Sequence, residues 1–279
     1  MFRADQGRPG GAIASGTAVF GFCWPRGRCT NAGARSKTDR AQQVVPAQRP
    51  APCPPARLRP RSLSITEIET LVRSPYDLYA KYVLALKALD PLGEEAGARE
   101  RGNLIHEVFA HFIEQEHDIM AENAGEILRA IAGQIFGVLD AQPDRRDIWL
   151  RRFDTVVKGF LNFERARQAG VTKRYAEKDL RWTFLIAGED FTLRGRADRI
   201  DVLNDNSFEI IDFKTGSIPT SGEMKDFLAP QMLLEAAIAG QKGFDEEPPA
   251  PTSELTYIKI GAGPEAFVPS KFVMAKDMD

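Results

Sequence analysis

Cysteine is scarce in this chain, and it is confined to one end. The 279 residues include three cysteines, the last of them at position 53: Cys23, Cys29 and Cys53. Their spacings match neither a CxxC metal-binding motif nor a disulfide framework. The sequence after position 53 therefore has no thiolate ligand for zinc or an iron-sulfur cluster. The lack of a disulfide pattern favours a cytoplasmic protein.

Two further absences narrow the function. No uninterrupted apolar run approaches the roughly 20 residues that a membrane-spanning helix needs, so we expect no contact with a membrane. No glycine-rich loop followed by Lys-Ser or Lys-Thr occurs, and such a loop is what cradles nucleotide phosphates in many ATPases. The chain is therefore not expected to hydrolyse ATP, and any motor would belong to a partner.

Charge is nearly balanced in total but divided along the chain. Residues 1–61 hold eleven of the 37 basic and two of the 39 acidic residues, so this segment carries about +9 and the remainder about −11. The same segment is rich in Pro, Gly, Ala and Arg and shows no helix or strand period. We predict a disordered basic tail over residues 1–61 and one folded domain over residues 62–279.

Apolar periodicity predicts the elements of that domain. Ser64-Ile65-Thr66-Glu67 has the capping-box pattern of a helix start. Helical spacing predicts further helices over residues 102–115, 126–139 and 148–167, and another that opens at Pro230. Alternating apolar residues predict strands over residues 180–186, 191–202, 208–214 and 255–260. The expected fold class is α/β: a helix, a three-stranded antiparallel meander, a helix and a strand, with extra N-terminal helices.

The third of these strands ends in Asp212-Phe213-Lys214. Side chains two apart in a strand share a face, so the aspartate and the lysine join Ile210 in a half-buried layer. Charges are costly there unless something uses them. Pairing Asp198 of the preceding strand with Asp212 also pairs Ile200 with Ile210 and leaves a five-residue connection. That register sets the two aspartates side by side.

Two such carboxylates repel each other unless a cation lies between them. Hard oxygen ligands suit Mg²⁺ or Mn²⁺. An ion of this kind can polarise a phosphoryl oxygen and lower the pKa of a bound water, while Lys214 supports the developing negative charge or orients the attacking water. His106 shares a helix face with Phe109 and Ile113, so it can point inward. Phosphodiester hydrolysis is the reaction that uses all of these groups.

Four segments together match a known pattern: Gly102–His106, the strand with Asp198, Asp212–Gly216, and Gln231 on the following helix. They resemble the PD-(D/E)XK nuclease domain of the RecB family. The lead-in Ser64–Glu69, with Ser74-Pro75-Tyr76 and Gln231–Ala237, is similar more narrowly to the C-terminal part of AddB-type helicase-nuclease subunits. The likeness covers roughly residues 62–260 and implies a restriction-endonuclease-like core.

The resemblance implies a role for each matching residue. The metal, Mg²⁺ or Mn²⁺, would be bound by His106, Asp198, Asp212 and the Phe213 carbonyl. Lys214 would be the catalytic lysine, and Gln231 would face the DNA and support the active site. The resemblance further implies a DNA exonuclease of double-strand break repair that acts on single strands together with an AddA-type helicase-nuclease partner.

The sequence departs from the family pattern in three places. Ser74 stands where some relatives have a cluster-binding cysteine, so no iron-sulfur cluster is expected. Glu235 replaces the tyrosine usually found four residues after the glutamine. The chain also stops soon after its last predicted strand, as a domain truncated at the C-terminus would.

Other charged residues have plainer interpretations. Asp201 falls on the opposite face from Asp198 and is expected to meet solvent at the strand end. Glu177 is either an acid that supports the metal ligands or, as we expect, a strand-start charge. A local groove is expected to hold phosphates with Arg194, Arg196, Arg199, Lys214 and Lys225. The alternative to catalysis is a catalytically inactive DNA-binding or scaffolding module of the same repair complex.

Overall fold

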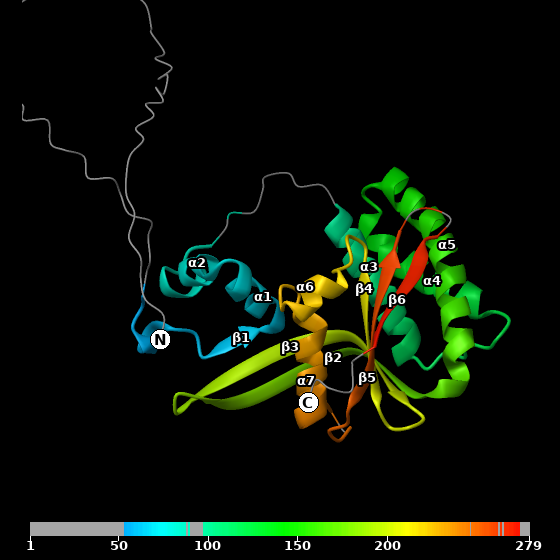
Figure 1. Cartoon of the computed structure of the whole chain (residues 1–279). Helices are drawn as coiled ribbons and strands as arrows, with labels where there is room; N and C mark the ends of the chain where they lie inside the picture. The colour runs from blue at the N-terminus through cyan, green and yellow to red at the C-terminus, as the bar shows by residue number, and fades with distance from the viewer. Residues whose placement is uncertain are drawn as a thin grey trace, which may run out of the picture. The chain divides into compact units, whose positions relative to one another are not determined.

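A mixed sheet organises the part of the chain that the computed structural model describes, residues 53–87, 89, 97–245, 247–261, 263 and 265–273 (Figure 1). Its six strands are β1 (Ser62–Ser64), β2 (Val171–Ile186), β3 (Glu189–Leu203), β4 (Phe208–Lys214), β5 (Thr252–Ile260) and β6 (Phe267–Val273). Strands β2, β3 and β4 form the predicted antiparallel meander, and β5 lies parallel to β4. The predicted α/β architecture is confirmed, while the short β1 and the edge strand β6 were not predicted. Most of the predicted tail, residues 1–52, lies outside the described residues.

The helices fall where apolar residues recur at helical spacing. They are α1 (Ile65–Arg73), α2 (Pro75–Leu78), α3 (Ala98–Glu114), α4 (Ala124–Ile135), α5 (Pro143–Arg167), α6 (Ser221–Lys225) and α7 (Gln231–Lys242). The predicted capping box opens α1: Glu67 N donates to Ser64 Oγ at 3.1 Å, and Ser64 N donates to Glu67 Oε2 at 2.8 Å. None of the described helices is both long and apolar enough to cross a membrane.

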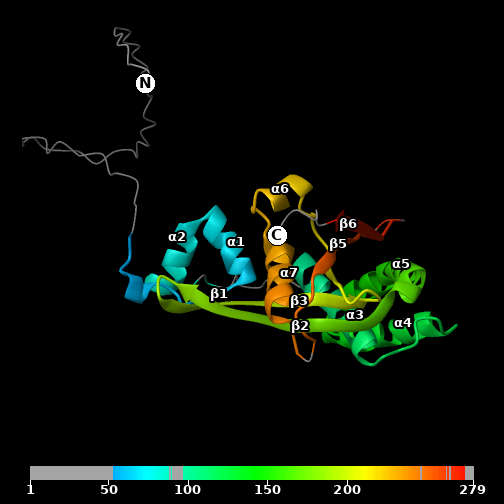
Figure 2. The same ribbon diagram turned by 60° about the horizontal axis from the view of Figure 1, so that its bottom comes forward.

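Helices cover both faces of the sheet (Figure 2). Phenylalanines of α3 and α5 pack with Phe213 and Ile258 on one face, and α1 and α7 pack with Ile210 and Leu255 on the other. Residues 208–213 of β4 are therefore all buried. The expected half-buried layer is instead a central strand covered on both sides, as parallel pairing with β5 favours.

The register between β3 and β4 is the one predicted from the sequence. Ile200 lies opposite Ile210 and Val202 opposite Phe208, across a five-residue connection. The paired ladder ends at Arg199 and Ile211, one step before the two aspartates. Nearer its N-terminal end, β3 has β1 instead of β4 as its neighbour on this edge, and β1 pairs with residues 192–194. Residues 195–198 of β3 thus face no strand of the described sheet on that edge, and we call this interval the β3 gap.

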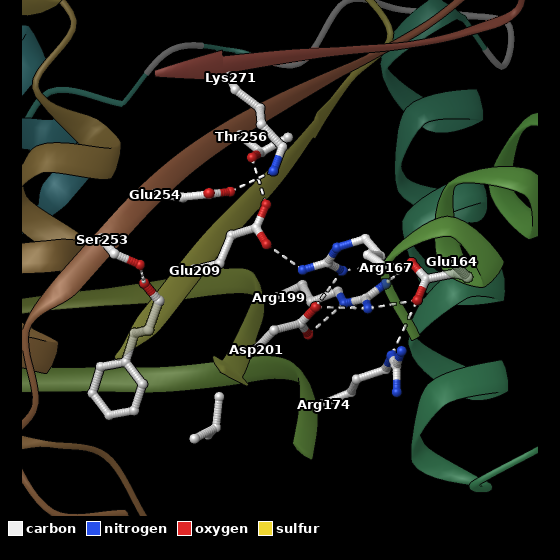
Figure 3. Close-up of polar contacts among 12 residues, drawn as sticks. Glu164, Arg167, Arg174, Arg199, Asp201, Glu209, Ser253, Glu254, Thr256 and Lys271 are labelled. Atoms are coloured by element: carbon white, nitrogen blue, oxygen red, sulfur yellow. Dashed lines mark hydrogen bonds and ion pairs between the residues drawn. The ribbon is translucent and has the colours of Figure 1, made fainter. Parts of the chain in front are cut away.

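Six buried or partly buried charges connect α5 to the sheet, and we call them the ion network (Figure 3): Glu164, Arg167, Arg174, Arg199, Asp201 and Glu209. Arg199 donates to Glu164 at 2.6 and 2.9 Å and to Asp201 at 2.7 and 2.8 Å. Thr256 Oγ1 donates to Glu209 at 2.6 Å. Asp201 is fully buried, so the expected solvent contact is wrong. Arg199, 1% exposed, cannot reach phosphates as expected, because α5 covers this face.

Candidate active site

The residues predicted to bind metal meet at the β3 gap. His106 comes from α3 on one side of the sheet, and its Nδ1 lies 3.3 Å from Asp198 Oδ2 on β3. Phe213 N donates to the same Oδ2 at 2.9 Å, which ties the end of β4 to β3 where the ladder stops. The rings of His106 and Phe213 pack with centroids 5.8 Å apart. The His106 ring and the backbone N–H of Phe213 therefore hold the carboxylate of Asp198 in place.

The catalytic residues predicted on β4 and α7 form a second set of contacts beside the first. Lys214 Nζ donates to Asp212 Oδ1 at 2.8 Å and to Gln231 Oε1 at 3.2 Å. Gln231 Nε2 donates to Asp212 Oδ1 at 2.9 Å and to Glu235 Oε1 at 3.2 Å. The amide of Gln231 thus fixes both the lysine and the aspartate. Every predicted site side chain takes part in one of these two sets.

One oxygen of this arrangement is left over. Asp212 is 1% exposed, and its Oδ2 is buried without a hydrogen-bond partner among the described residues. A buried carboxylate oxygen without a partner loses its hydration and gains no hydrogen bond in exchange, which costs free energy. The charges of Asp198 and His106 act on this carboxylate, although Asp212 is not among the three residues whose ligand atoms lie within 4.8 Å of one another: His106, Glu177 and Asp198. Carboxylates with an imidazole suit a hard divalent cation. The residues present therefore fit Mg²⁺ or Mn²⁺.

Glu177 lies with His106 and Asp198, although of its two interpretations from the sequence, an acid that supports the ligands and a strand-start charge, the second is the expected one. Ligand atoms of His106, Glu177 and Asp198 all lie within 4.8 Å of one another. The strand-start assignment is wrong because β2 begins at Val171, six residues earlier. Glu177 has a φ of 51°, a left-handed conformation that is unusual for a non-glycine residue inside a strand. Its carboxylate also pairs with Arg196 at 2.8 Å.

The sequence carried little signal for Glu177. The first ten residues of β2 lack a clean period-two alternation, with buried positions at Val171, Ala176 and Leu180. Ala176 pairs with Arg199 and Lys178 with Ala197, so Glu177 lies across from Asp198. That position follows from the register once β2 is extended backwards, and the extension is visible only in the structure.

Buried negative charge dominates the electrostatics of the site. Burial, followed by the charge of Asp198, raises the pKa of Asp212 to about 6. Burial and then Asp212 raise the pKa of Glu235 well above its usual value, and burial and then Asp198 raise the pKa of Glu177. Burial opposes charge on Lys214, but Asp212 outweighs it and raises the pKa of the lysine.

His106 follows the same balance. Burial disfavours its charged form, and the hydrogen bond and charge of Asp198 outweigh burial, so the pKa of the imidazole is raised. A bound divalent cation would reverse this tendency, because a metal ligand must offer a neutral ring nitrogen. The crowded acids and the raised pKa values favour a site that binds added positive charge.

Two hollows give access to the site. One, of about 450 Å³, is lined by residues that include Thr66, Arg181, Arg194, Gln231 and Glu235. The other, of about 540 Å³, is lined by Asn103, His106, Glu107, Ala110, His111, Glu114, Glu177, Arg196 and Asp198. Arg196 borders both hollows, so the two meet around β3. Lys225, expected in a phosphate groove, is exposed on α6 and lines neither of them.

Comparison with known proteins shows the family to which the chain belongs. The model of the PD-(D/E)XK nuclease superfamily matches residues 62–275. An uncharacterized protein of Rickettsia bellii is 32% identical over 186 residues, 67% of this chain and 22% of the relative. The B subunit of the ATP-dependent helicase/deoxyribonuclease of Carboxydothermus hydrogenoformans is 26% identical over 204 residues, 65% of this chain and 18% of the relative. The chain spans about a fifth of the length of these relatives.

A solved structure, titled "Crystal structure of SSO0001", is 13% identical and covers 76% of this chain and 79% of that one. Its TM-score is 0.25, which is too low to support any argument. The family match spans most of the chain, and distant relatives carry the name of the helicase/deoxyribonuclease B subunit, so the expected likeness to AddB-type proteins is confirmed. This chain belongs to the PD-(D/E)XK nuclease superfamily.

Proposed function

We propose that this chain hydrolyses phosphodiester bonds of DNA with Mg²⁺ or Mn²⁺. The observation that carries the proposal is the unpartnered, buried Oδ2 of Asp212 beside an ammonium group. A purely structural carboxylate at this depth would have both oxygens bonded. Here Lys214 and Gln231 occupy only Oδ1 and leave the other oxygen directed at no described protein group.

The proposed roles follow from the contacts. Asp198, Asp212 and His106 would hold the cation with the Phe213 carbonyl, and Glu177 is a further candidate ligand. The bound cation would supply a polarised phosphoryl oxygen and a water of lowered pKa. Lys214 would stabilise the negative charge that develops on the scissile phosphate, because its ammonium is held by two acceptors. Gln231 would keep that ammonium in position through its Oε1.

We further propose that the substrate is single-stranded DNA, degraded as by an exonuclease during double-strand break repair, and that a helicase partner of the AddA type delivers it. The support is the similarity to proteins named as the B subunit of an ATP-dependent helicase/deoxyribonuclease. The rival function is an inactive scaffolding or DNA-binding module. The intact set of lysine, aspartates and histidine favours catalysis, because a scaffold has no use for a buried carboxylate oxygen that lacks a hydrogen-bond partner among the described residues.

The test is cleavage of a labelled single strand by the purified chain with Mg²⁺ or Mn²⁺. Lys214→Ala is expected to lower the rate by at least about 100-fold, the usual cost of removing a group that stabilises transition-state charge. Lys225→Ala, which removes an exposed lysine from α6, is the matched control and should cut like the wild type. Equal cleavage by Lys214→Ala and the control would refute the mechanism.

Metal binding separates the enzyme from the scaffold. Titration calorimetry should detect Mn²⁺ binding to the wild type that Asp212→Ala abolishes. Circular dichroism on both proteins establishes that each is folded. A folded wild-type chain that binds no Mn²⁺ would favour the scaffolding role.

A further inference from the structure

We propose that the outward face of the β2–β3 ribbon, through Arg181, Arg194 and Arg196, binds phosphates of the substrate DNA strand that neighbour the phosphate being cut. The proposal rests on the proposed function, since it needs a strand that runs to the β3 gap. Figure 2 shows this ribbon extending beyond the rest of the sheet, with α1 on one side of it.

The arginines lie on the side of the ribbon away from α1. Leu180 and Leu193 pack in the same core cluster as Ile65 of α1, and a Cβ on Gly195 would meet the Ile65 side chain at 2.2 Å. Side chains alternate along a strand, so the residues between these positions point to the opposite side. Those residues are Arg181 on β2, and Arg194 and Arg196 on β3, and all three are exposed. The same face also carries the exposed Asp179, so the ribbon has one apolar face and one charged face with an excess of positive charge.

Two of these charges oppose each other directly, while Asp179, two residues before Arg181 on β2, lies opposite Arg196. Arg181 and Arg194 are direct cross-strand neighbours. Like charges at such positions destabilise a sheet. Neither guanidinium forms an ion pair with any residue in the described part of the chain. The next pair along the ribbon, Thr183 and Thr192, adds two hydroxyls 2.9 Å apart. An anion at this place would relieve the repulsion and find several donors.

The cationic row is continuous with the site. Arg196 is the member of the row that lies closest along β3 to Asp198, two residues before it. Arg196 in addition touches Glu177 at 2.8 Å and borders the second hollow beside His106. Arg194 precedes Asp198 by four residues, which is about 13 Å along a strand. The row therefore leads from the outer ribbon to the β3 gap.

The chemistry of the row selects phosphates. A guanidinium presents a planar fork of donors that matches a phosphate, and it stays charged at every relevant pH. Along β3 the row repeats every second residue, so it offers charge at intervals along a line, as a polyanionic backbone does. The rest of the chain after position 61 carries a net charge of about −11, so a local cationic row must overcome general repulsion of DNA.

The experiment compares two double variants of the full chain. Arg181→Gln/Arg194→Gln removes the opposed pair, and Arg151→Gln/Lys158→Gln removes the same charge from the exposed surface of α5. Binding of a fluorescent 20-nucleotide single strand is measured by anisotropy in EDTA over a series of salt concentrations. The ribbon variant should bind roughly 10- to 30-fold more weakly at 0.1 M salt and lower the slope of log K against log salt by about 1.4, the value for two phosphate contacts. The α5 variant should bind like the wild type.

A small substrate separates this proposal from the proposed function. Hydrolysis of bis(p-nitrophenyl) phosphate with Mn²⁺ reports the metal site alone, because so small a diester does not span the distance to Arg181 and Arg194. The ribbon variant should keep this activity, which Lys214→Ala loses. A wild type that hydrolyses neither substrate would overturn the proposed nuclease activity. Weaker DNA binding by the ribbon variant would in that case still support the arginine row as a phosphate-binding surface. Equal DNA affinity of the ribbon and α5 variants, or loss only of protein-partner binding, would overturn the row.

Discussion

The ion network and the active site place similar charges on the same two strands, with opposite results. In the network, three guanidiniums meet three carboxylates, and the central arginine makes four hydrogen bonds. In the active site, one lysine, one histidine and the exposed Arg196 meet four acids: Glu177, Asp198, Asp212 and Glu235. One region is neutral and closed, and the other is negative and leaves an oxygen unpaired among the described residues.

The pKa values express the difference. Burial disfavours the charge on Asp201, yet Arg199 and then Arg167 outweigh it, and the pKa of Asp201 is lowered. For Asp212, burial and the neighbouring aspartate prevail over Lys214, and the pKa is raised. Asp201 and Asp212 are both almost fully buried. A buried carboxylate is thus part of the scaffold where guanidiniums surround it, and part of the functional site where they do not.

Removing a charge from the ion network should have the largest effect on the free energy of unfolding. Arg199→Ala leaves Glu164 and Asp201 buried without their main partner, and we expect it to lower the free energy of unfolding by about 3–5 kcal/mol. Urea unfolding in EDTA measures the change. Arg196→Ala, an exposed arginine of the same strand, should cost about 1 kcal/mol or less. A similar cost for both variants would mean that the network contributes no more than a surface pair.

Removing a charge from the active site should stabilise the metal-free protein. The pKa of Asp212 is raised from 3.8 to about 6, so a proton on this carboxyl favours the folded state. That contribution to the free energy of unfolding is fully present below pH 3.8 and is lost as the pH rises through 6. Asp212→Asn should therefore raise the free energy of unfolding at pH 8 by about 1–3 kcal/mol. The gain should shrink toward pH 4.

The same urea titrations, repeated with Mn²⁺, sharpen that prediction. The metal should stabilise the wild type and leave Asp212→Asn almost unchanged, because a ligand stabilises only the state that binds it. A loss of stability in Asp212→Asn at pH 8 would instead show a carboxylate that is favourably paired, as in the network.

The smallest effect concerns the backbone. Glu177→Gly relieves a left-handed conformation at φ 51°, and we expect a gain of about 0.5–1 kcal/mol after the entropy cost of glycine. Ala187→Gly is the matched control, since Ala187 has φ 52° in the exposed β2–β3 turn. Both should gain stability in urea unfolding. Only Glu177→Gly should weaken Mn²⁺ binding, by about 10- to 100-fold; unchanged affinity would remove Glu177 from the site.

Much of the site could be read from the sequence, because local rules govern the residues concerned. The capping box at Ser64 and Glu67 fixed where α1 begins, and helical spacing turned His106 inward. The side-chain alternation of strands, with a five-residue connection, sufficed for the register that brings Asp198 near Asp212. Their roles as ligands and catalysts remain predictions.

The rest could not be read locally, because it depends on partners far along the chain. Arg199 and Asp201 look like solvent-facing charges in a strand, and Glu164 like a surface charge of α5, until the fold buries all three together. The strand-start charge was the expected interpretation of Glu177 because its left-handed backbone breaks the alternation of β2. The connection before β6 carries a Gly-Pro turn signal at Gly263 and Pro264, but Pro269 interrupts the run that follows, and only its pairing with β5 defines the strand.

The site at the β3 gap draws on elements spread from α3 to α7, and this has a consequence for biosynthesis. Contacts so distant in sequence form late, after the loops between them have closed. A nascent polypeptide that has emerged only through β4 lacks Gln231, the residue that holds the ammonium in place. On the proposed function, we therefore expect the newly made chain to gain activity only after α7 has docked.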